Sequence, residues 1–398
     1  MNPDVINLFK REFAHTPPHV VQAPGRLELL GNHTDYNQGL VLSLAIDRYV
    51  WIAIAPRTDG RVELVTSAFR EKESFALSNM ERNPKTLWAD YVKGVLAQLQ
   101  KREIVVRGFN AAIHSSIPFG AGLSSSAALE VATGLAMRKM SPFAFKPSGS
   151  SFVPKVDERG QAPPLTVTDR LELARICQAA ENQFVGAQTG MLDQISSLFG
   201  KAFHAIETDF QSLAVEHVPM IGEIAIVVCD SGVKHTLAGG EYNTLRQFCE
   251  SAATKLGVKS LRRVDRSMLA MNRSRFDERE YQCAAHITGE VQRVIFGARA
   301  LREGDFEQFG QYMFQSHESS RDLFQNSTPE LDLLVELARA HPACYGARLT
   351  GGGFGGSTLN LVRRDQVQEF MRAMAKQYQE RSGHATDPML CQIADGAQ

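Results

Sequence analysis

Blocks of apolar residues along the chain predict strands and helices in turn. The run VLSLAIDRYVWIAIAP, within residues 20–60, is rich in β-branched residues and flanked by turn-forming residues, which is typical of a strand. WADYVKGVLAQLQK (88–101) has apolar positions at helical spacing. VRGFNAAIHSSI predicts a further strand, and ALEVATGLAMRKM predicts a helix after a loop of glycines and serines. The N-terminal MNPDVINLFKREF predicts a short amphipathic helix.

Farther along the chain we predict another helix and then a second domain, which begins with a strand and is mainly helical. LTVTDRLELARICQAAENQF predicts a helix with Thr168 as its N-cap and Asp169 in its first turn. EIAIVVCDSGV predicts a buried strand that opens a second domain, and residues 240–320 are predicted to be mostly helical. ARLTGGGFGGSTLNLVRR places a glycine loop between two strands. Residues 141–166 are rich in Pro, Ser and Gly and predict a long surface excursion or a partly disordered loop.

Length and composition indicate a globular protein of two domains. The chain has 398 residues, more than one typical core holds, and 43% of them are hydrophobic. The net charge of -1 gives no sign of the basic face that nucleic-acid binding requires. We find neither an apolar stretch of about 18 residues nor a signal peptide, so no membrane association is expected. Six cysteines without a CxxC pair predict reduced thiols and a cytoplasmic location.

The segment IPFGAGLSSSAALEVA carries the strongest local signal for chemistry. Gly120 and Gly122 let the backbone approach a ligand closely, and three serines then lead into a helix. The free N–H groups and positive dipole end of that helix suit a phosphate. No Gly-Lys-Ser/Thr follows, so this is not a Walker A loop. A serine-capped helix after a flexible loop is the alternative that this segment alone leaves open.

A second glycine cluster, TGGGFGG, formally satisfies the GxGxxG pattern of dinucleotide-binding folds. That pattern requires a helix directly after it and an early place in a βαβ unit. Here the strand-like STLNLV follows, close to the C-terminus. The cluster therefore indicates a loop that another chain segment or a ligand must touch.

Two polar segments complete the candidate chemistry. PGRLELLGNHTDYNQG places Arg26, Asp35 and several amide or imidazole groups in a short span, which fits recognition of a polyhydroxylated ligand. ENQFVGAQTGMLDQISSLFG carries Glu181 and Asp193, and a kinase uses one carboxylate for Mg²⁺ and another for the attacking hydroxyl. Polar loops and solvated acids near a helix end are the alternatives for these segments.

In this order the four segments resemble the GHMP small-molecule kinases and, within them, the galactokinases. GRLELLGNHTDYN resembles the galactokinase signature Gly-Arg-x-Asn-(x)-x-Gly-Glu-His-Thr-Asp-Tyr-Asn, IPFGAGLSSSAA the ATP-binding motif, and LTGGGFGGSTLNLV the C-terminal motif. WADYVKG, AENQFVGAQTGMLDQ, VCDSGVKHTLAGGEYNTLRQFCE and SHESSRDLFQNSTPELD also match. The resemblance covers nearly the whole chain except residues 141–166.

The resemblance implies a role for each of a set of residues. Asp193 matches the catalytic aspartate, and Arg26 matches the arginine beside it. Ser126 and Glu181 match the ligands of Mg²⁺. The positions that match sugar contacts are Arg26, Asn32, His33, Asp35, Gly190, Asp193 and Tyr242. The positions that match nucleotide contacts are Gly120, Gly122, Ser124, Ser125, Trp88 and Tyr91.

The resemblance also implies a fold and an activity. We expect an α+β, two-domain GHMP kinase fold, with a ribosomal-protein-S5-like domain over residues 1–205 and a C-terminal GHMP α/β sandwich domain over residues 206–398. ATP and sugar would meet between the domains, and the γ-phosphoryl group would pass directly to the anomeric hydroxyl of galactose, with Mg²⁺ neutralising charge. A monomer or a weak homo-oligomer is expected.

The chain departs from the signature at two positions. The Glu of the signature is Asn32 here, and its Asn is Glu28. The resemblance implies a contact from position 32 to a sugar hydroxyl toward C6, and a neutral amide can still bond a hydroxyl. We therefore predict altered tolerance at C6. A kinase for galacturonate, arabinose or N-acetylgalactosamine, and a sugar- and ATP-binding sensor without catalysis, are the alternatives.

Overall fold

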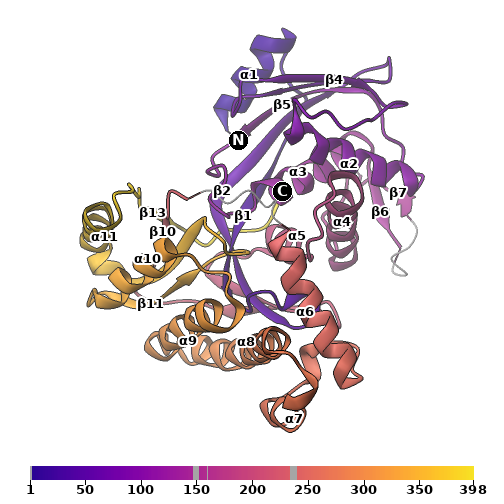
Figure 1. The fold of residues 1–398 in the computed structure, drawn as a ribbon. Helices are drawn as coiled ribbons and strands as arrows, with labels where there is room; N and C mark the ends of the chain where they lie inside the picture. The colour runs from indigo at the N-terminus through magenta and orange to yellow at the C-terminus, as the bar shows by residue number, and fades with distance from the viewer. Residues whose placement is uncertain (1, 147–151, 159, 234–239) are drawn as a thin grey trace.

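The computed structural model describes residues 2–146, 152–158, 160–233 and 240–398, which form two large sheets, with helices packed around them, and a third sheet of two short strands (Figure 1). The larger sheet has the order β4-β3-β5-β2-β8-β9, and β1 also pairs with β2. Only β3 and β5 pair in parallel among its described strands. Its strands are β1 (His19–Leu30), β2 (Leu40–Pro56), β3 (Arg61–Thr66), β4 (Lys72–Ala76), β5 (Phe109–Ser115), β8 (His204–Asp209) and β9 (Ala214–Pro219).

Helices cover both faces of the larger sheet because side chains alternate along its strands. Ile52 and Ile54 of β2 face the main core, whereas Ala53 and Ala55 face a smaller cluster under α1 (Pro3–Phe13). The main core lies beneath α2 (Leu87–Lys101), α3 (Ser125–Met140), α4 (Val167–Ala180) and α5 (Leu192–Phe199). The helix predicted at the N-terminus and the one predicted over residues 88–101 are both confirmed.

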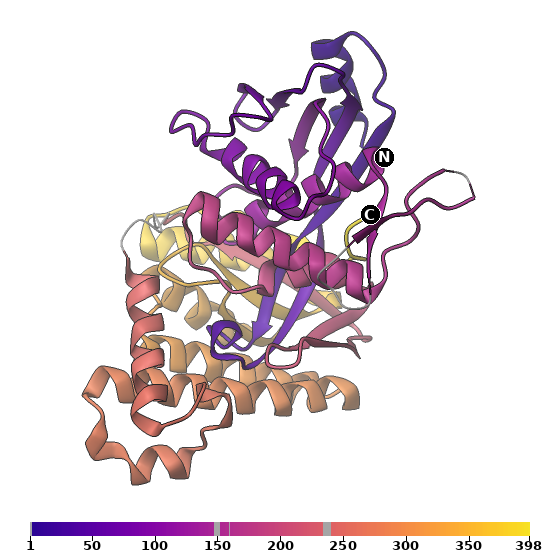
Figure 2. The same ribbon diagram turned by 90° about the vertical axis from the view of Figure 1, so that its right-hand side faces the viewer.

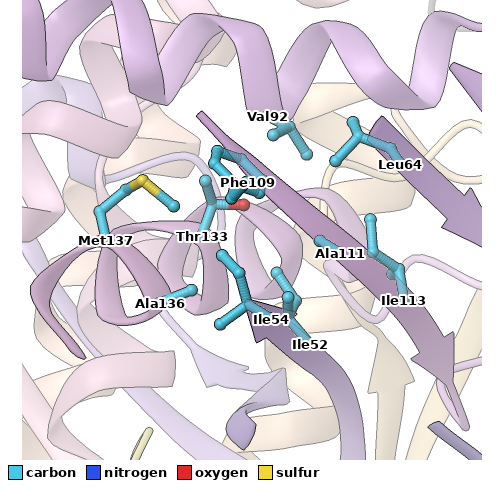
Figure 3. A pocket seen from close by; sticks show the side chains of 10 residues that line it. All are labelled: Ile52, Ile54, Leu64, Val92, Phe109, Ala111, Ile113, Thr133, Ala136 and Met137. Carbon is cyan, nitrogen blue, oxygen red and sulfur yellow. The ribbon is translucent and has the colours of Figure 1, made fainter. Parts of the chain in front are cut away.

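The core between this sheet and its helices is closely packed. Figure 3 shows the side chains around a small gap in this core, which is about 10 Å³ and is lined by Ile52, Ile54, Leu64, Val92, Phe109, Ala111, Ile113, Thr133, Ala136 and Met137. Thr133 is the only polar residue among them, and its hydroxyl is already bonded to the Leu129 carbonyl at 2.8 Å. A gap of this size holds one water at most. The gap is therefore too small for an organic ligand.

The second half of the chain builds the smaller sheet, in the order β11-β12-β10-β13. Its strands are β10 (Ile224–Asp230), β11 (Cys344–Leu349), β12 (Ser357–Arg363) and β13 (Met389–Cys391). Its helices are α6 (Glu241–Leu256), α7 (Arg266–Met271), α8 (Glu278–Glu303), α9 (Phe306–Ser319), α10 (Pro329–Ala340) and α11 (Val367–Ser382). In Figure 2 α6 and α7 stand at one end of the molecule. The predicted strand at 223–233 and the helical region at 240–320 are confirmed over the described residues.

Two local predictions need correction. The N-cap of α4 is Thr166 rather than Thr168, because the Thr166 hydroxyl accepts the Asp169 N–H at 3.1 Å and the Asp169 carboxylate accepts the Thr166 N–H at 2.9 Å. This reciprocal capping box requires a spacing of three residues. The segment 141–166 begins with the buried strand β6 (Phe143–Phe145), which pairs with β7 (Phe152–Pro154). Residues 147–151 and 159 of that segment lie outside the described residues.

The division predicted between residues 205 and 206 falls inside β8, and it stays a prediction. β8 and β9 both belong to the larger sheet, and β10 is the first strand of the smaller one. Within the described residues, no helix is both long and apolar enough to cross a membrane.

Candidate active site

An arginine and an aspartate that lie far apart in the sequence meet at the centre of the site. Arg26, on β1, donates from Nε to Oδ1 of Asp193, in the first turn of α5, at 2.8 Å. The Ser124 hydroxyl donates to the other oxygen, Oδ2. Arg26 also donates from Nη1 to the Gly122 carbonyl at 2.6 Å. One guanidinium thus fixes both the carboxylate and the glycine loop, while the Asp193 side chain keeps 28% of its surface exposed.

The two glycine loops pack against each other at the start of α3. Gly122 and Ser124 adopt left-handed backbone conformations with φ of 74° and 58°, and α3 begins at Ser125 with free N–H groups. The Ser357 hydroxyl donates to the Ala121 carbonyl at 2.8 Å. A side chain at Gly351 would come within 3.3 Å of the Gly122 carbonyl oxygen. The prediction that TGGGFGG lies between two strands and touches another segment is therefore confirmed.

Buried carboxyl groups lie next to Asp193. Glu181 begins the π-helical turn η2 (Glu181–Val185), and its Oε2 accepts from the Thr189 hydroxyl at 2.7 Å. The Gln194 amide donates to Oε2 of Glu181 at 3.1 Å and to Oε2 of Glu130 at 3.0 Å. Burial, and then the charge of Asp193, raise the pKa of Glu181 to about 7. Burial raises the pKa of Glu130 well above its ordinary value.

The oxygen atoms of Glu181, Glu130 and Ser126 are of the kind that binds a divalent cation. Glu130 Oε1 is buried without a hydrogen-bond partner in the described residues, and Ser126 lies one helical turn before it. Carboxylate and hydroxyl oxygens are the ligands that Mg²⁺ prefers, and it commonly takes only one or two carboxylates from the protein. No group of three or more His, Cys, Asp or Glu in the described part of the chain could hold a metal alone. The residues therefore fit Mg²⁺ that takes its remaining ligands from outside the protein.

Aromatic and imidazole rings of the signature segment and of α6 pack against one another. His33 donates from Nε2 to the Gly352 carbonyl at 3.0 Å, so its Nδ1 accepts from the Tyr36 hydroxyl at 2.9 Å. Burial lowers the pKa of His33 to about 4, which keeps the ring neutral. The half-buried Tyr242 ring, in the first turn of α6, lies 4.9 Å from the His33 ring between centroids.

Asp35 and Gly190 meet at close range. Asp35 begins the 3-10 helix η1 (Asp35–Asn37), and a Cβ at Gly190 would lie 1.7 Å from its Oδ2. Only glycine therefore fits at position 190. Burial raises the pKa of Asp35 to about 7, and the charges of Glu28 and Asp193 add to the rise. The structure thus brings Asp35, Gly190 and Asp193 to one region.

Asn32 lies deeper than the other candidate sugar contacts. Its side chain is fully buried, and its amide nitrogen donates to Glu28 Oε1 at 3.1 Å and to the Gly351 carbonyl at 2.8 Å. Its amide oxygen accepts from Asn326 at 2.9 Å and from Ser320 at 3.4 Å. These bonds use both N–H groups and the oxygen of the amide. The direct sugar contact expected of Asn32 therefore stays a prediction, and no free polar group of its side chain supports it.

The two aromatic residues expected to contact the nucleotide, Trp88 and Tyr91, lie on α2. The Trp88 indole N–H donates to Glu71 Oε2 at 2.7 Å, which fixes the ring. Burial raises the pKa of Tyr91, and the charges of Glu181 and Glu130 add to the rise. Tyr91 therefore lies within electrostatic range of the acidic cluster, and contact of either ring with a nucleotide stays a prediction.

Sequence reasoning missed two residues of α8 that hold the signature segment. Glu290 accepts the N–H groups of Gly31 and Asn32 at 2.9 and 3.0 Å, and His286, one turn earlier, contacts the Asn32 carbonyl at 3.2 Å. Burial opposes the charge of Glu290, but the Arg293 guanidinium and the backbone donors hold its pKa below the ordinary value. Charged residues on a helix usually face solvent, so the sequence carried no signal for this role. Glu130 did carry one, since it is a lone carboxyl in the apolar run ALEVATGLA.

Family comparisons agree with this geometry. The galactokinase galactose-binding signature matches residues 7–56, the GHMP kinases N-terminal domain matches residues 90–148, and the GHMP kinases C-terminal family matches residues 298–380.

The chain is similar to curated galactokinases along nearly its whole length. It is 39% identical over 393 residues to a galactokinase of Chloroflexus aurantiacus, covering 98% of this chain and 95% of that protein. It is 40% identical over 398 residues to the galactokinase of Homo sapiens, covering 98% and 94%. The crystal structure of Lactococcus lactis galactokinase complexed with galactose matches with a TM-score of 0.88 at 29% identity, covering 99% and 98%. A mevalonate kinase with a TM-score of 0.58 at 18% identity shares the fold.

Proposed function

This chain belongs to the galactokinase family of the GHMP kinases, and on that premise we propose how its residues transfer the terminal phosphoryl group of ATP to D-galactose. The observation that carries the proposal is the Arg26–Asp193 pair at 2.8 Å, joined through the same guanidinium to the Gly122 carbonyl of the glycine loop. Arg26 thereby connects the Asp193 carboxylate, which we assign to the sugar hydroxyl, with the glycine loop, which we assign to the phosphates.

Asp193 orients the anomeric hydroxyl of galactose for in-line attack and accepts its proton. Arg26 and Ser124 each hold one oxygen of this carboxylate, so its orientation is set before substrates bind. The transition state of phosphoryl transfer is loose, so positioning contributes more than base strength. Asp35, His33, Gly190 and Tyr242 contact or shape the sugar around this point.

The loop at 120–125 and the first N–H groups of α3 hold the phosphates, with Trp88 and Tyr91 toward the nucleotide base. The free N–H groups and positive dipole end of α3 favour the anionic phosphates. Ser126 and Glu181 would hold Mg²⁺, which neutralises negative charge that develops on the phosphoryl oxygens when it is bound. Thr189 and Gln194 orient Glu181 for this purpose.

The test is Asp193→Asn. We expect kcat to fall by at least about 1,000-fold, because the amide neither accepts the proton nor pairs with Arg26, while nucleotide affinity changes little. Galactose-dependent ADP release measures the rate, and calorimetry with an ATP analogue measures binding. The matched control is Asp47→Asn, which makes the same acid-to-amide change at another partly exposed aspartate paired with an arginine, Arg48 at 3.0 Å, and should leave kcat unchanged. Turnover of Asp193→Asn within tenfold of the wild type would exclude the assigned role.

A further inference from the structure

Arg26 and Glu28 stand on the same face of one strand. Their Cα partners on β2 are Ala45 and Ser43, with no register shift between them. Leu27 and Leu29 point the other way into the main core. Two residues along a strand span about 7 Å. The Glu28 side chain therefore lies about that far from the Arg26 position, on the side toward Asn32 and the second glycine loop.

Glu28 is held through only one of its two oxygens. Oε1 accepts from Arg348 Nη1 at 2.9 Å and from the Asn32 amide at 3.1 Å. In the described residues Oε2 accepts no hydrogen bond. It is also not fully enclosed by other atoms. The residue as a whole is 3% exposed, and because Oε2 is unpaired but not fully enclosed, this oxygen keeps some accessible surface. A carboxylate oxygen of a largely buried residue that lacks a protein partner is available to a ligand hydroxyl or a water.

Glu28 lies within electrostatic range of two candidate sugar contacts. The charge of Glu28 adds to the effect of burial in raising the pKa of both Asp35 and Tyr242. The Glu28 N–H lies 3.0 Å from the Thr350 hydroxyl, directly before the glycine loop whose Gly352 faces the Tyr242 ring. The charges of Arg348 and Arg26 act on Glu28 itself, against the burial that raises its pKa.

We propose that Glu28 is a specificity-determining residue, whose Oε2 accepts a hydrogen bond from a hydroxyl on the edge of the sugar farthest from the reacting oxygen. This proposal rests on the proposed function, which places the reacting hydroxyl at Asp193 and Arg26. It assigns to Glu28 the direct contact that the sequence led us to expect of Asn32, whose amide instead fixes the Glu28 carboxylate from behind. A carboxylate at this place favours neutral hydroxyls and repels a uronate.

The experiment compares kcat/KM for galactose, 6-deoxygalactose, 4-deoxygalactose and galacturonate. Ratios of kcat/KM between sugars do not depend on the fraction of active enzyme, so partial misfolding does not affect them. For Glu28→Gln we expect about 10- to 100-fold loss with galactose and less than about threefold loss with the deoxy sugar that lacks the contacting hydroxyl. Galacturonate should improve relative to galactose by at least about tenfold.

Two further variants separate specificity from structure. Glu28→Asp keeps the charge next to Arg348 but withdraws it from the sugar, so it should show the same selective loss. Glu280→Gln on α8 is the matched control, since Glu280 is 4% exposed and paired with Lys255 at a distance from the site. Its sugar ratios should equal those of the wild type.

Equal loss with galactose and both deoxy sugars in Glu28→Gln and Glu28→Asp would overturn the inference and leave Glu28 as the counter-ion of Arg348. Failure of the proposed function is a different result, in which the wild type itself phosphorylates none of the sugars. In that case calorimetric affinities of the same sugars for the wild type and the two Glu28 variants provide the ratios, and unchanged ratios would again overturn it.

Discussion

The contact between Gly190 and Asp35 makes a sharp quantitative prediction for Gly190→Ala. The methyl carbon would lie 1.7 Å from Asp35 Oδ2, whereas Cβ atoms keep at least about 3.0 Å, so the carboxylate must move by at least about 1.3 Å. A displacement of about 1 Å at a substrate-positioning group can cost about 100-fold in rate. We therefore expect kcat/KM for galactose to fall about 100-fold, or about 2.7 kcal/mol of transition-state stabilisation.

The assay is initial-rate kinetics at saturating ATP together with calorimetric galactose binding. The thermal midpoint should change little, because Gly190 is half-exposed in the segment between η2 and α5. The same change is then made in an Asp35→Ala background, where the clash has been removed and the additional loss should be below about threefold. A full 100-fold further loss in that background, or a single variant with wild-type kinetics, would show that Asp35 is not what the methyl displaces.

Two other predictions concern the same pocket. Glu290→Gln should raise KM for galactose about 10-fold or more and leave KM for ATP within about twofold, because the amide has a single acceptor oxygen and must turn its NH2 either toward the Gly31 and Asn32 donors or toward Arg293. Equal changes in both KM values in steady-state kinetics would contradict it. Burial raises the pKa of Asp35 to about 7, so its carboxylate ionises as the pH rises through 7. Because the ionised form can accept hydrogen bonds from sugar hydroxyls, KM for galactose should fall over this range. Between about pH 4 and 7 the folded chain holds a proton that the unfolded chain releases, so the Asp35 contribution to stability decreases as pH rises across that window. Asp35→Asn should remove both dependences, and a KM profile unchanged by it would assign the titration to another group.

Local patterns were sufficient for much of the fold. The helical spacing in WADYVKGVLAQLQK and the β-branched run before Pro56 predicted α2 and β2, because periodicity and propensity agree there. The start of α4 was misplaced because Thr166 and Thr168 both precede Asp169, and only the spacing of three residues forms a capping box. The buried strand β6 was missed inside a segment whose Pro and Gly content indicated a surface loop.

The site divides along similar lines. Arg26 and Asp193 are 167 residues apart, so family motifs, rather than spacing, led to their pairing. Glu290 and His286 act on the backbone of Asn32, and a backbone contact leaves no trace in the residue types of the segment that is held. Glu28 was noticed as a departure from the signature, but which of its oxygens is free depends on Arg348, which lies 320 residues away.

The unbroken pairing of Arg26 and Glu28 with β2 has a consequence for how this scaffold can change its substrate. Under the roles proposed above for Arg26 and Glu28, the distance between the reacting end of the sugar and the end that is recognised is set by the repeat of an extended strand rather than by a hinge. Sugars with a longer or shorter carbon frame cannot be accommodated by sliding these two groups apart. A change to such sugars must therefore come from the loops around the rest of the sugar. The position of the hydroxyl that accepts the phosphoryl group would stay the same.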